Sequence, residues 1–193
     1  DTGAMYRAAA LYLADRNIDP ADRPAVAQAV ADLPLRLVLR GGGARVELAG
    51  VEPGDRLRRP EVGSLSSRIA VHPEVRRRLV ALQQEFVQRH GGVMEGRDIG
   101  TVVVPATPFK FYLDADPAVR AERRHAELAG KGATTDPAEV ARQLAERDER
   151  DSSRTASPLQ AAADAFHINT GGLLPEEVVD VMVAEIRQRS DRT

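Results

Sequence analysis

Oppositely charged side chains stand next to each other in a glycine-rich stretch near the middle of the sequence (residues 91–101), at Arg97 and Asp98. Val93 and Met94, just before them, have the apolar character of a short strand. Because ligands of open α/β sheets bind at the carboxyl ends of strands, a fixed cation beside a fixed anion at this point predicts a ligand site. The alternative is a surface turn with a local ion pair.

Arginines also gather at three other points of the chain. They are Arg7 close to Thr2, then Arg120 with Arg123 and Arg124, and finally Arg147, Arg150 and Arg154 with Asp148 and Asp151 between them. Residues three, four or seven positions apart share one face of a helix, and the arginine fork matches phosphate oxygens in a bidentate way. These groups are therefore candidates for phosphate binding, although for Arg120, Arg123 and Arg124 a charged helix face is the favoured interpretation. Ordinary helix-surface salt bridges are the alternative for each of them.

The composition excludes several other classes of site. The 193 residues include no cysteine, which rules out disulfides and thiolate metal ligands, and the four histidines lack metal-ligand spacing. We therefore predict no zinc site and assign no metal ligand. A net charge of −2 argues against a general nucleic-acid binder. No apolar run is long enough for a membrane span and no signal peptide is recognisable, so we expect a cytoplasmic protein.

Apolar periodicity and turn residues predict the elements that position these side chains. Helical spacing covers 4–13, 24–31, 61–70 and 73–89, and strands at 35–40 and 44–48 flank the glycines 41–43 as an antiparallel hairpin. Later in the chain, strands at 109–113 and 165–168 alternate with helices at 117–129, 136–151 and 175–188. This alternation predicts an α/β fold in which helices flank a parallel sheet.

Five segments together resemble bacterial cytidylate kinases. They are residues 1–7 (DTGAMYR), 95–105 (EGRDIGTVVVP), 111–115 (FYLDA), 147–154 (RDERDSSR) and 157–159 (SPL). The likeness covers essentially the whole chain, and DTGAMYR and GRDIGT are its most specific parts. It implies a P-loop nucleoside-monophosphate-kinase core that transfers the γ-phosphoryl group of ATP, with Mg²⁺, to CMP or dCMP in pyrimidine nucleotide metabolism.

The resemblance also implies how the chain is organised. We expect a single kinase domain (1–193) and a monomer. Its core would comprise 1–20, 91–125 and 155–193, with an NMP-binding part at 21–90, a small antiparallel β insertion at about 31–60, and a helical lid at 126–154.

The residues that the resemblance assigns to CMP come from every part of the chain. They are Thr2, Tyr6, Arg7, Ser67, Arg76, Arg97, Asp98, Arg147, Asp151 and Arg154. Of these, Arg97, Arg147 and Arg154 would also have a catalytic role by neutralising the transferred phosphoryl group. Arg120 and Arg124 would face ATP.

The base is expected to be selected by Ser67, Arg76 and Asp98. Cytosine presents an amino donor beside the N3 and O2 acceptors, so a carboxylate and a guanidinium form its complement. Uracil would place a carbonyl group against the carboxylate. The phosphate would be held by guanidinium groups and the sugar by Asp151 with Arg147.

The likeness to the family is incomplete at one point. No segment has the phosphate-binding pattern G-x-x-x-x-G-K-S/T, because the nearest candidate, Gly130-Lys131, has His125 and Gly132 at two required positions. We therefore expect a missing upstream segment, and no useful kinase activity from the polypeptide as printed. The alternatives are a non-catalytic nucleotide-binding remnant and a kinase for another small phosphate acceptor. An RNA-binding protein is least favoured, since aromatic residues are sparse.

Overall fold

The structure is a computed structural model that describes residues 1–153 and 159–191 of the chain. Its N-terminal elements are α1 (Gly3–Ala14), α2 (Arg23–Ala31), β1 (Leu35–Arg40), β2 (Gly43–Leu48), the 3₁₀ helix η1 (Gly54–Arg58), α3 (Pro60–Ile69) and α4 (Pro73–His90). The later elements are the π-helical turn η2 (Ile99–Val103), β3 (Phe111–Asp114), α5 (Pro117–Gly130), α6 (Pro137–Ser152), β4 (Phe166–Asn169) and α7 (Pro175–Ser190). Helices and strands thus lie close to the positions predicted from the sequence.

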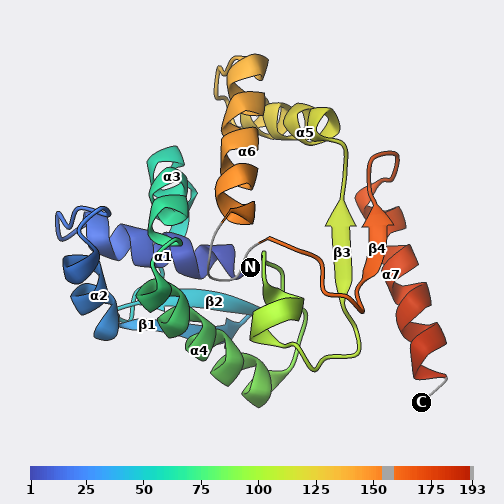
Figure 1. Cartoon of the computed structure of the whole chain (residues 1–193), viewed down its shortest axis with the longest axis horizontal. Helices are drawn as coiled ribbons and strands as arrows, with labels where there is room; N and C mark the ends of the chain where they lie inside the picture. The colour runs from blue at the N-terminus through green and yellow to red at the C-terminus, as the bar shows by residue number, and fades with distance from the viewer. Residues whose placement is uncertain (154–158, 192–193) are drawn as a thin grey trace.

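Figure 1 shows how these elements are arranged. Helices α1 to α4 and the β1–β2 hairpin pack together in one group, and β3, β4 and α7 form a second group. Helices α5 and α6 project from the end of β3, and α6 points back towards the N-terminus of α1. The predicted α/β class is confirmed, with helices beside a small parallel sheet.

Local chemistry explains where most helices begin. Six of the helices carry proline in their first turn, where its missing N–H costs no hydrogen bond. Three of them are also capped by an aspartate whose carboxylate accepts a backbone N–H, namely Asp22 from Ala25, Asp116 from Ala118 and Asp136 from Ala138. These signals are local, so the sequence pattern was sufficient to find the helices.

Two glycines make the predicted hairpin possible. Gly41 and Gly42 have φ values of 58° and 77°, which residues with a Cβ rarely adopt. They form the two-residue turn between Arg40 and its partner Gly43. The strands pair in antiparallel register from there to Leu35 and Leu48. The hairpin packs on α1, which holds the N-terminal group together.

Helix α1 lies at the centre of the hydrophobic core. Its residues Met5 and 8–13 are all buried, and Val26, Ile69 and Leu79 of the surrounding helices are fully buried against the same cluster. A helix that is apolar on nearly every side has to be enclosed by other elements. The first turn of α1 is consequently held in a fixed place, and it carries several of the predicted site residues.

Strands β3 and β4 form the parallel pair that the sequence predicted. Their register runs from Phe111 opposite Phe166 to Asp114 opposite Asn169. In the described residues, no helix is both long enough and apolar enough to cross a membrane.

One predicted strand is wrong. Val93 and Met94 have no strand conformation, and the side chain of Val93 is 95% exposed. A strand is stabilised by pairing with a neighbour, and in the described part of the chain β3 and β4 pair only with each other. The apolar pair therefore lies in an extended loop after Gly91 and Gly92, and the chain next turns into η2, where Asp98 O accepts from the backbone N–H groups of 102 and 103.

Candidate active site

The loop that carries Arg97 and Asp98 is fixed to the first turn of α1. The backbone N–H and the hydroxyl of Thr2 both donate to the carbonyl oxygen of Glu95, at 3.2 and 2.7 Å. A Cβ on Gly96 would lie 2.4 Å from Thr2 Oγ1, so only glycine fits at this close approach. The glycine of the Gly-Arg-Asp motif is therefore required by packing between two segments far apart in the sequence.

On its other side the loop is supported by a buried lysine. Lys110, at the start of the β3 segment, donates from Nζ to the carbonyl oxygen of Pro105 at 2.6 Å and to both carboxylate oxygens of Asp164 at 2.9 and 2.7 Å. Its alkyl stem contacts Gly100, where an added Cβ would be 3.2 Å from Lys110 Cδ. Sequence analysis missed this residue because a lone lysine beside a strand carries no distinctive pattern.

Asp98 and Arg76 form a buried ion pair. Their side chains are only 7% and 5% exposed, and the Arg76 guanidinium lies 5.7 Å from the centre of the Tyr6 ring. The Nε atom of this Arg76 is buried and has no hydrogen-bond partner among the described residues, and the same is true of Ser67 Oγ in α3. Buried polar groups are almost always hydrogen-bonded, so an unpaired nitrogen within an ion pair indicates a place for a polar ligand.

A second cluster joins the same loop to α6. Arg97 Nε donates to Asp151 Oδ2 at 3.1 Å, and Arg147 Nε lies 3.8 Å from the same oxygen. The Asp151 side chain is 8% exposed. Burial lowers the pKa of Arg147, the nearby cations Arg97 and Arg7 lower it further, and the carboxylate of Asp151 opposes them. Two of the predicted phosphate-binding arginines, Arg97 and Arg7, therefore lie within electrostatic reach of Arg147.

Arg7 reaches this cluster from α1. Its Nη2 lies 2.5 Å from Asp1 Oδ2, while Asp1 Oδ1 accepts from the backbone N–H of Ala4. Burial lowers the pKa of Arg7, and the neighbouring cations Arg124 and Arg58 act in the same direction, against Glu95. Arg58, from η1, was not among the sequence candidates, because an isolated arginine in a turn has no periodic signal.

The two arginines predicted to face ATP lie in different surroundings. Arg120 Nη1 lies 2.5 Å from Asp148 Oδ2 of α6. Arg124 is paired with the exposed Glu127 at 2.7 Å and lies within electrostatic reach of Arg7. The predicted phosphate ligand Arg154 lies outside the described residues.

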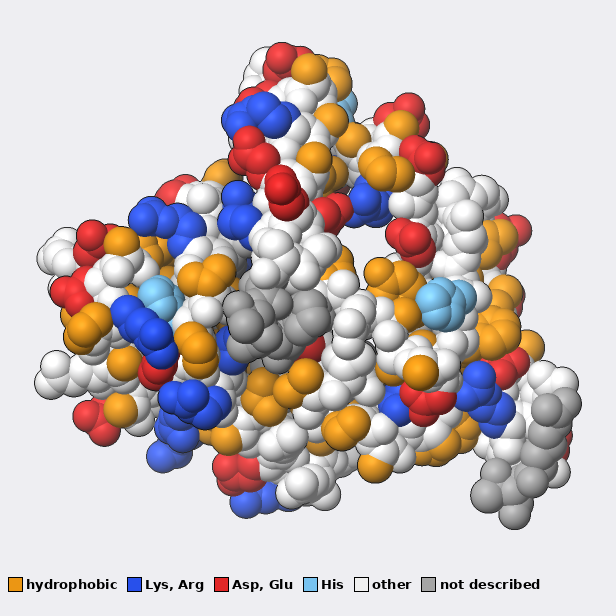
Figure 2. All heavy atoms as spheres, viewed as in Figure 1, with side chains coloured by type: hydrophobic (Ala, Val, Ile, Leu, Met, Phe, Trp, Pro, Cys, Tyr) orange, Lys and Arg blue, Asp and Glu red, His pale blue; other side chains and the backbone are white. Residues whose placement is uncertain are grey.

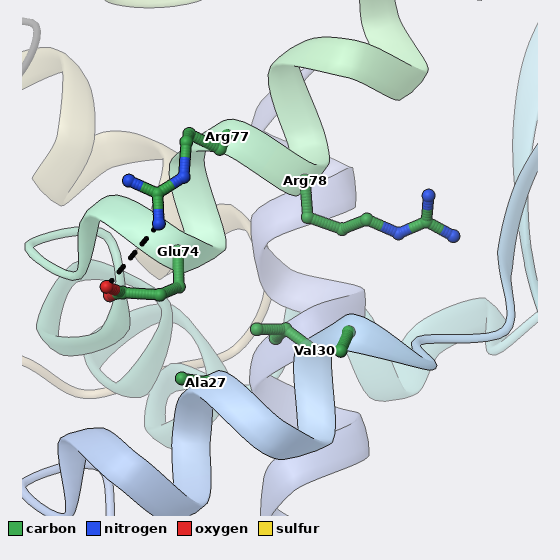
Figure 3. Close-up of a pocket in the computed structure, with 6 residues that line it drawn as sticks. Ala27, Val30, Glu74, Arg77 and Arg78 are labelled. Atoms are coloured by element: carbon green, nitrogen blue, oxygen red, sulfur yellow. Dashed lines mark ion pairs between the residues drawn. The ribbon is translucent and has the colours of Figure 1, made fainter.

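A further feature is a cavity that lies away from both charged clusters. A cavity of about 370 Å³ between α2 and α4 is lined by Ala27, Val30, Ala31, Glu74, Arg77 and Arg78. Figure 3 shows the Glu74–Arg77 ion pair at one side of this cavity and the small apolar side chains of α2 below it. It shares no residue with either cluster, and we assign no chemistry to it.

The surface charges are mixed in sign. On the face shown in Figure 2, basic and acidic side chains are interspersed with apolar ones and form no continuous basic stripe. Among the described residues, no group of three or more His, Cys, Asp or Glu side chains could hold a metal ion. The arrangement is therefore suited to an anionic small molecule that is contacted mainly by guanidinium groups.

Comparison with known proteins agrees with this interpretation. The family model for cytidylate kinase matches residues 1–188. Cytidylate kinase from Corynebacterium efficiens is 44% identical, over 100% of this chain and 84% of the relative. The enzymes of the same name from Pelotomaculum thermopropionicum and Geobacter sulfurreducens are 42% and 39% identical, over 96% and 100% of this chain and 83% of each relative.

Proposed function

The chain belongs to the cytidylate kinase family, whose members are nucleoside monophosphate kinases, and from this membership we propose that its two charged clusters bind the parts of one CMP or dCMP molecule. The reaction is phosphoryl transfer from ATP to give CDP or dCDP. The buried Asp98–Arg76 cluster would select the base, and the Arg7–Arg97–Arg147 cluster would hold the phosphate.

The observation that carries this proposal is the unsatisfied nitrogen of the Asp98–Arg76 pair. Arg76 Nε is buried without a protein partner in the described part of the chain, on a guanidinium that pairs with a carboxylate only 7% exposed, and Ser67 Oγ is also buried without a partner. Cytosine offers an amino donor to the carboxylate and acceptors to the two donors, so one base would satisfy all three groups. Uracil would place a carbonyl oxygen against the Asp98 carboxylate, and this repulsion would lower the affinity for uracil nucleotides.

The arginine cluster matches the phosphate end of the same ligand. Burial lowers the pKa of Arg7 and of Arg147, and the nearby cations Arg97 and Arg7 lower that of Arg147 further, which means that an added anion would relieve repulsion and desolvation together. We assign Asp151 to the sugar hydroxyls, Thr2 and Tyr6 to the wall of the site, and Arg154 to the phosphate by family resemblance.

Catalysis would rest on position and charge, because phosphoryl transfer requires in-line alignment and neutralisation of oxygen charges more than a protein nucleophile. Arg97 and Arg147 would stabilise the transferring group. Mg²⁺, when bound together with ATP, would supply charge neutralisation at the phosphates.

The parts of the chain would have separate tasks. We propose that 21–90 binds the nucleoside monophosphate, that 126–154 closes over the phosphates as a lid and excludes water, and that the rest forms the core. We further propose a cytoplasmic monomer that acts on nucleotides and not on nucleic acid. Because no segment of the printed sequence has the phosphate-loop pattern, we expect the 193-residue polypeptide alone to bind CMP and to turn over poorly.

Calorimetric titration of the polypeptide with CMP, dCMP, UMP and AMP tests the proposal. We expect CMP and dCMP to bind at least tenfold more tightly than UMP or AMP. Equal affinity for all four nucleotides would contradict the assignment of the base site. Tighter binding of another phosphorylated acceptor would support a kinase of different specificity instead.

A further inference from the structure

An ion pair joins the two helices that follow β3. Arg120 of α5 reaches Asp148 of α6 with 2.5 Å between Nη1 and Oδ2, and the two side chains are 35% and 23% exposed. The same guanidinium donates from Nε to the carbonyl oxygen of Ala115 at 3.2 Å, at the point where the chain leaves β3. One side chain thus connects α6 to the end of the sheet.

The part of α5 that carries Arg120 is hydrogen-bonded to the ends of the two strands. Arg123, on the next part of α5, donates to Thr170 Oγ1 at 3.0 Å and to Thr170 O at 2.5 Å. Thr170 in turn donates from its backbone N–H to Asp114 O at 2.7 Å. The first turns of α5 are therefore hydrogen-bonded to the carboxyl ends of both β3 and β4, and Arg120 projects from a fixed base.

The other end of the connection lies at the active-site cluster. Asp148 directly follows Arg147 and precedes Asp151 by three residues, so all three belong to the last two turns of α6. Asp151 pairs with Arg97 of the core loop, whereas Asp148 pairs with α5. Two carboxylates of one helix are held by arginines from two different parts of the molecule.

We propose that Arg120 and Asp148 are positioning residues, which set the approach of α6 so that Arg147 and Asp151 face Arg97. This inference rests on the proposed function of that cluster, and it gives Arg120 a role other than direct contact with ATP. As a positioning pair, the two side chains act together and removal of either has the same effect.

The absence of cysteine in the sequence allows a direct test of geometry. Spin labels on Ala81→Cys in α4 and Ala145→Cys in α6, both exposed positions, report the distance between α6 and the N-terminal group. We expect Asp148→Asn and Arg120→Gln to broaden or shift this distance distribution. Glu146→Gln, which removes surface ion pairs of the same helix, is the matched control and should leave it unchanged.

Titration with CMP supplies the functional readout. Asp148→Asn and Arg120→Gln should each weaken CMP binding about fivefold, the scale of a partly exposed ion pair, and the double variant should be no weaker than either single one. Asp148→Glu, which keeps the charge, should restore most of the affinity. An unchanged label distance in Asp148→Asn would overturn the inference, as would additive losses in the double variant.

The same measurements separate this inference from the proposed function. If the wild-type chain fails to prefer CMP, the assignment of the base site is wrong. The label distances test the Arg120–Asp148 pair whether or not nucleotide binds. An unchanged distance in Asp148→Asn would therefore reject the positioning role of this pair and leave the proposed base site untouched.

Discussion

Asp98 and Arg76 come from a loop and a helix that are 22 residues apart, yet they form an ion pair whose side chains are only 7% and 5% exposed. Removing two charges from water is costly, and such a pair is weak evidence for stability by itself. The buried Arg76 Nε, which has no partner among the described residues, supports instead the proposal that the charges are kept for a ligand.

Asp98→Asn should relax the preference for cytosine over uracil. The amide can donate to the carbonyl oxygen of uracil where the carboxylate only accepts. We expect the ratio of CMP to UMP affinity to fall about tenfold, corresponding to roughly 1.4 kcal/mol. Titration of both nucleotides measures the ratio, and Glu85→Gln, at an exposed pair on α4, serves as the control. An unchanged ratio would remove Asp98 from the base site.

Arg97→Ala should weaken binding of CMP much more than binding of cytidine. A hydrogen bond to a charged group contributes about 1.5–3 kcal/mol, and cytidine has no phosphate to lose. Paired titrations with CMP and cytidine test this, with Arg89→Ala as a surface-arginine control. Equal losses for the two ligands would mean that Arg97 supports the loop and does not contact the phosphate.

Gly96→Ala should lower the free energy of unfolding by about 1–3 kcal/mol, because its methyl group would overlap Thr2 Oγ1 and Ile99. Urea denaturation measures the loss. Gly63→Ala is the matched control: no heavy atom lies within 4 Å of an added Cβ there, and alanine in a helix stabilises by about 0.5–1 kcal/mol. Comparable stability of the two variants would show that the loop does not need the close contact with α1.

Acid should weaken the contact between α2 and α4. The hydrogen bond from Arg23 holds the pKa of Glu74 at about 2, below its ordinary value of 4.5. Because the folded state favours the carboxylate, its stabilising contribution is complete above about pH 4.5 and is lost as the pH falls towards 2. Glu74→Gln should therefore flatten the decline of stability between these values. Midpoints of urea denaturation, measured at several pH values between these limits, test the flattening. Glu149→Gln controls for the loss of an exposed carboxylate.

The sequence was most informative where the determinants are local. Proline and aspartate at helix starts, and the glycines 41–43 of the hairpin, depend on neighbours within a few positions, so these elements were predicted correctly. Val93 and Met94 were not, because a strand depends on a partner elsewhere in the chain. The Arg120–Asp148 pair likewise follows from folding, since no spacing rule links two residues 28 positions apart.

Family resemblance, in contrast, predicted which residues far apart in the sequence would share a site. It grouped Arg7, Arg97, Arg147 and Asp151, and the structure places these four in one neighbourhood. Physical patterns alone made each group of arginines a separate candidate for phosphate binding and did not join the groups into one site. The roles of these residues in binding remain predictions until the titrations above are made.

Asp151, shared by Arg97 and Arg147, has a further consequence for how the site receives its ligand. Cations brought together without a counter-ion would spread apart, and an arriving phosphate would have to gather them. In this structure the carboxylate of Asp151 already pairs with both arginines in place of a phosphate. If the nucleotide binds as proposed, its phosphate would replace one negative partner by another, and little rearrangement of the guanidinium groups would be left to accompany the chemical step.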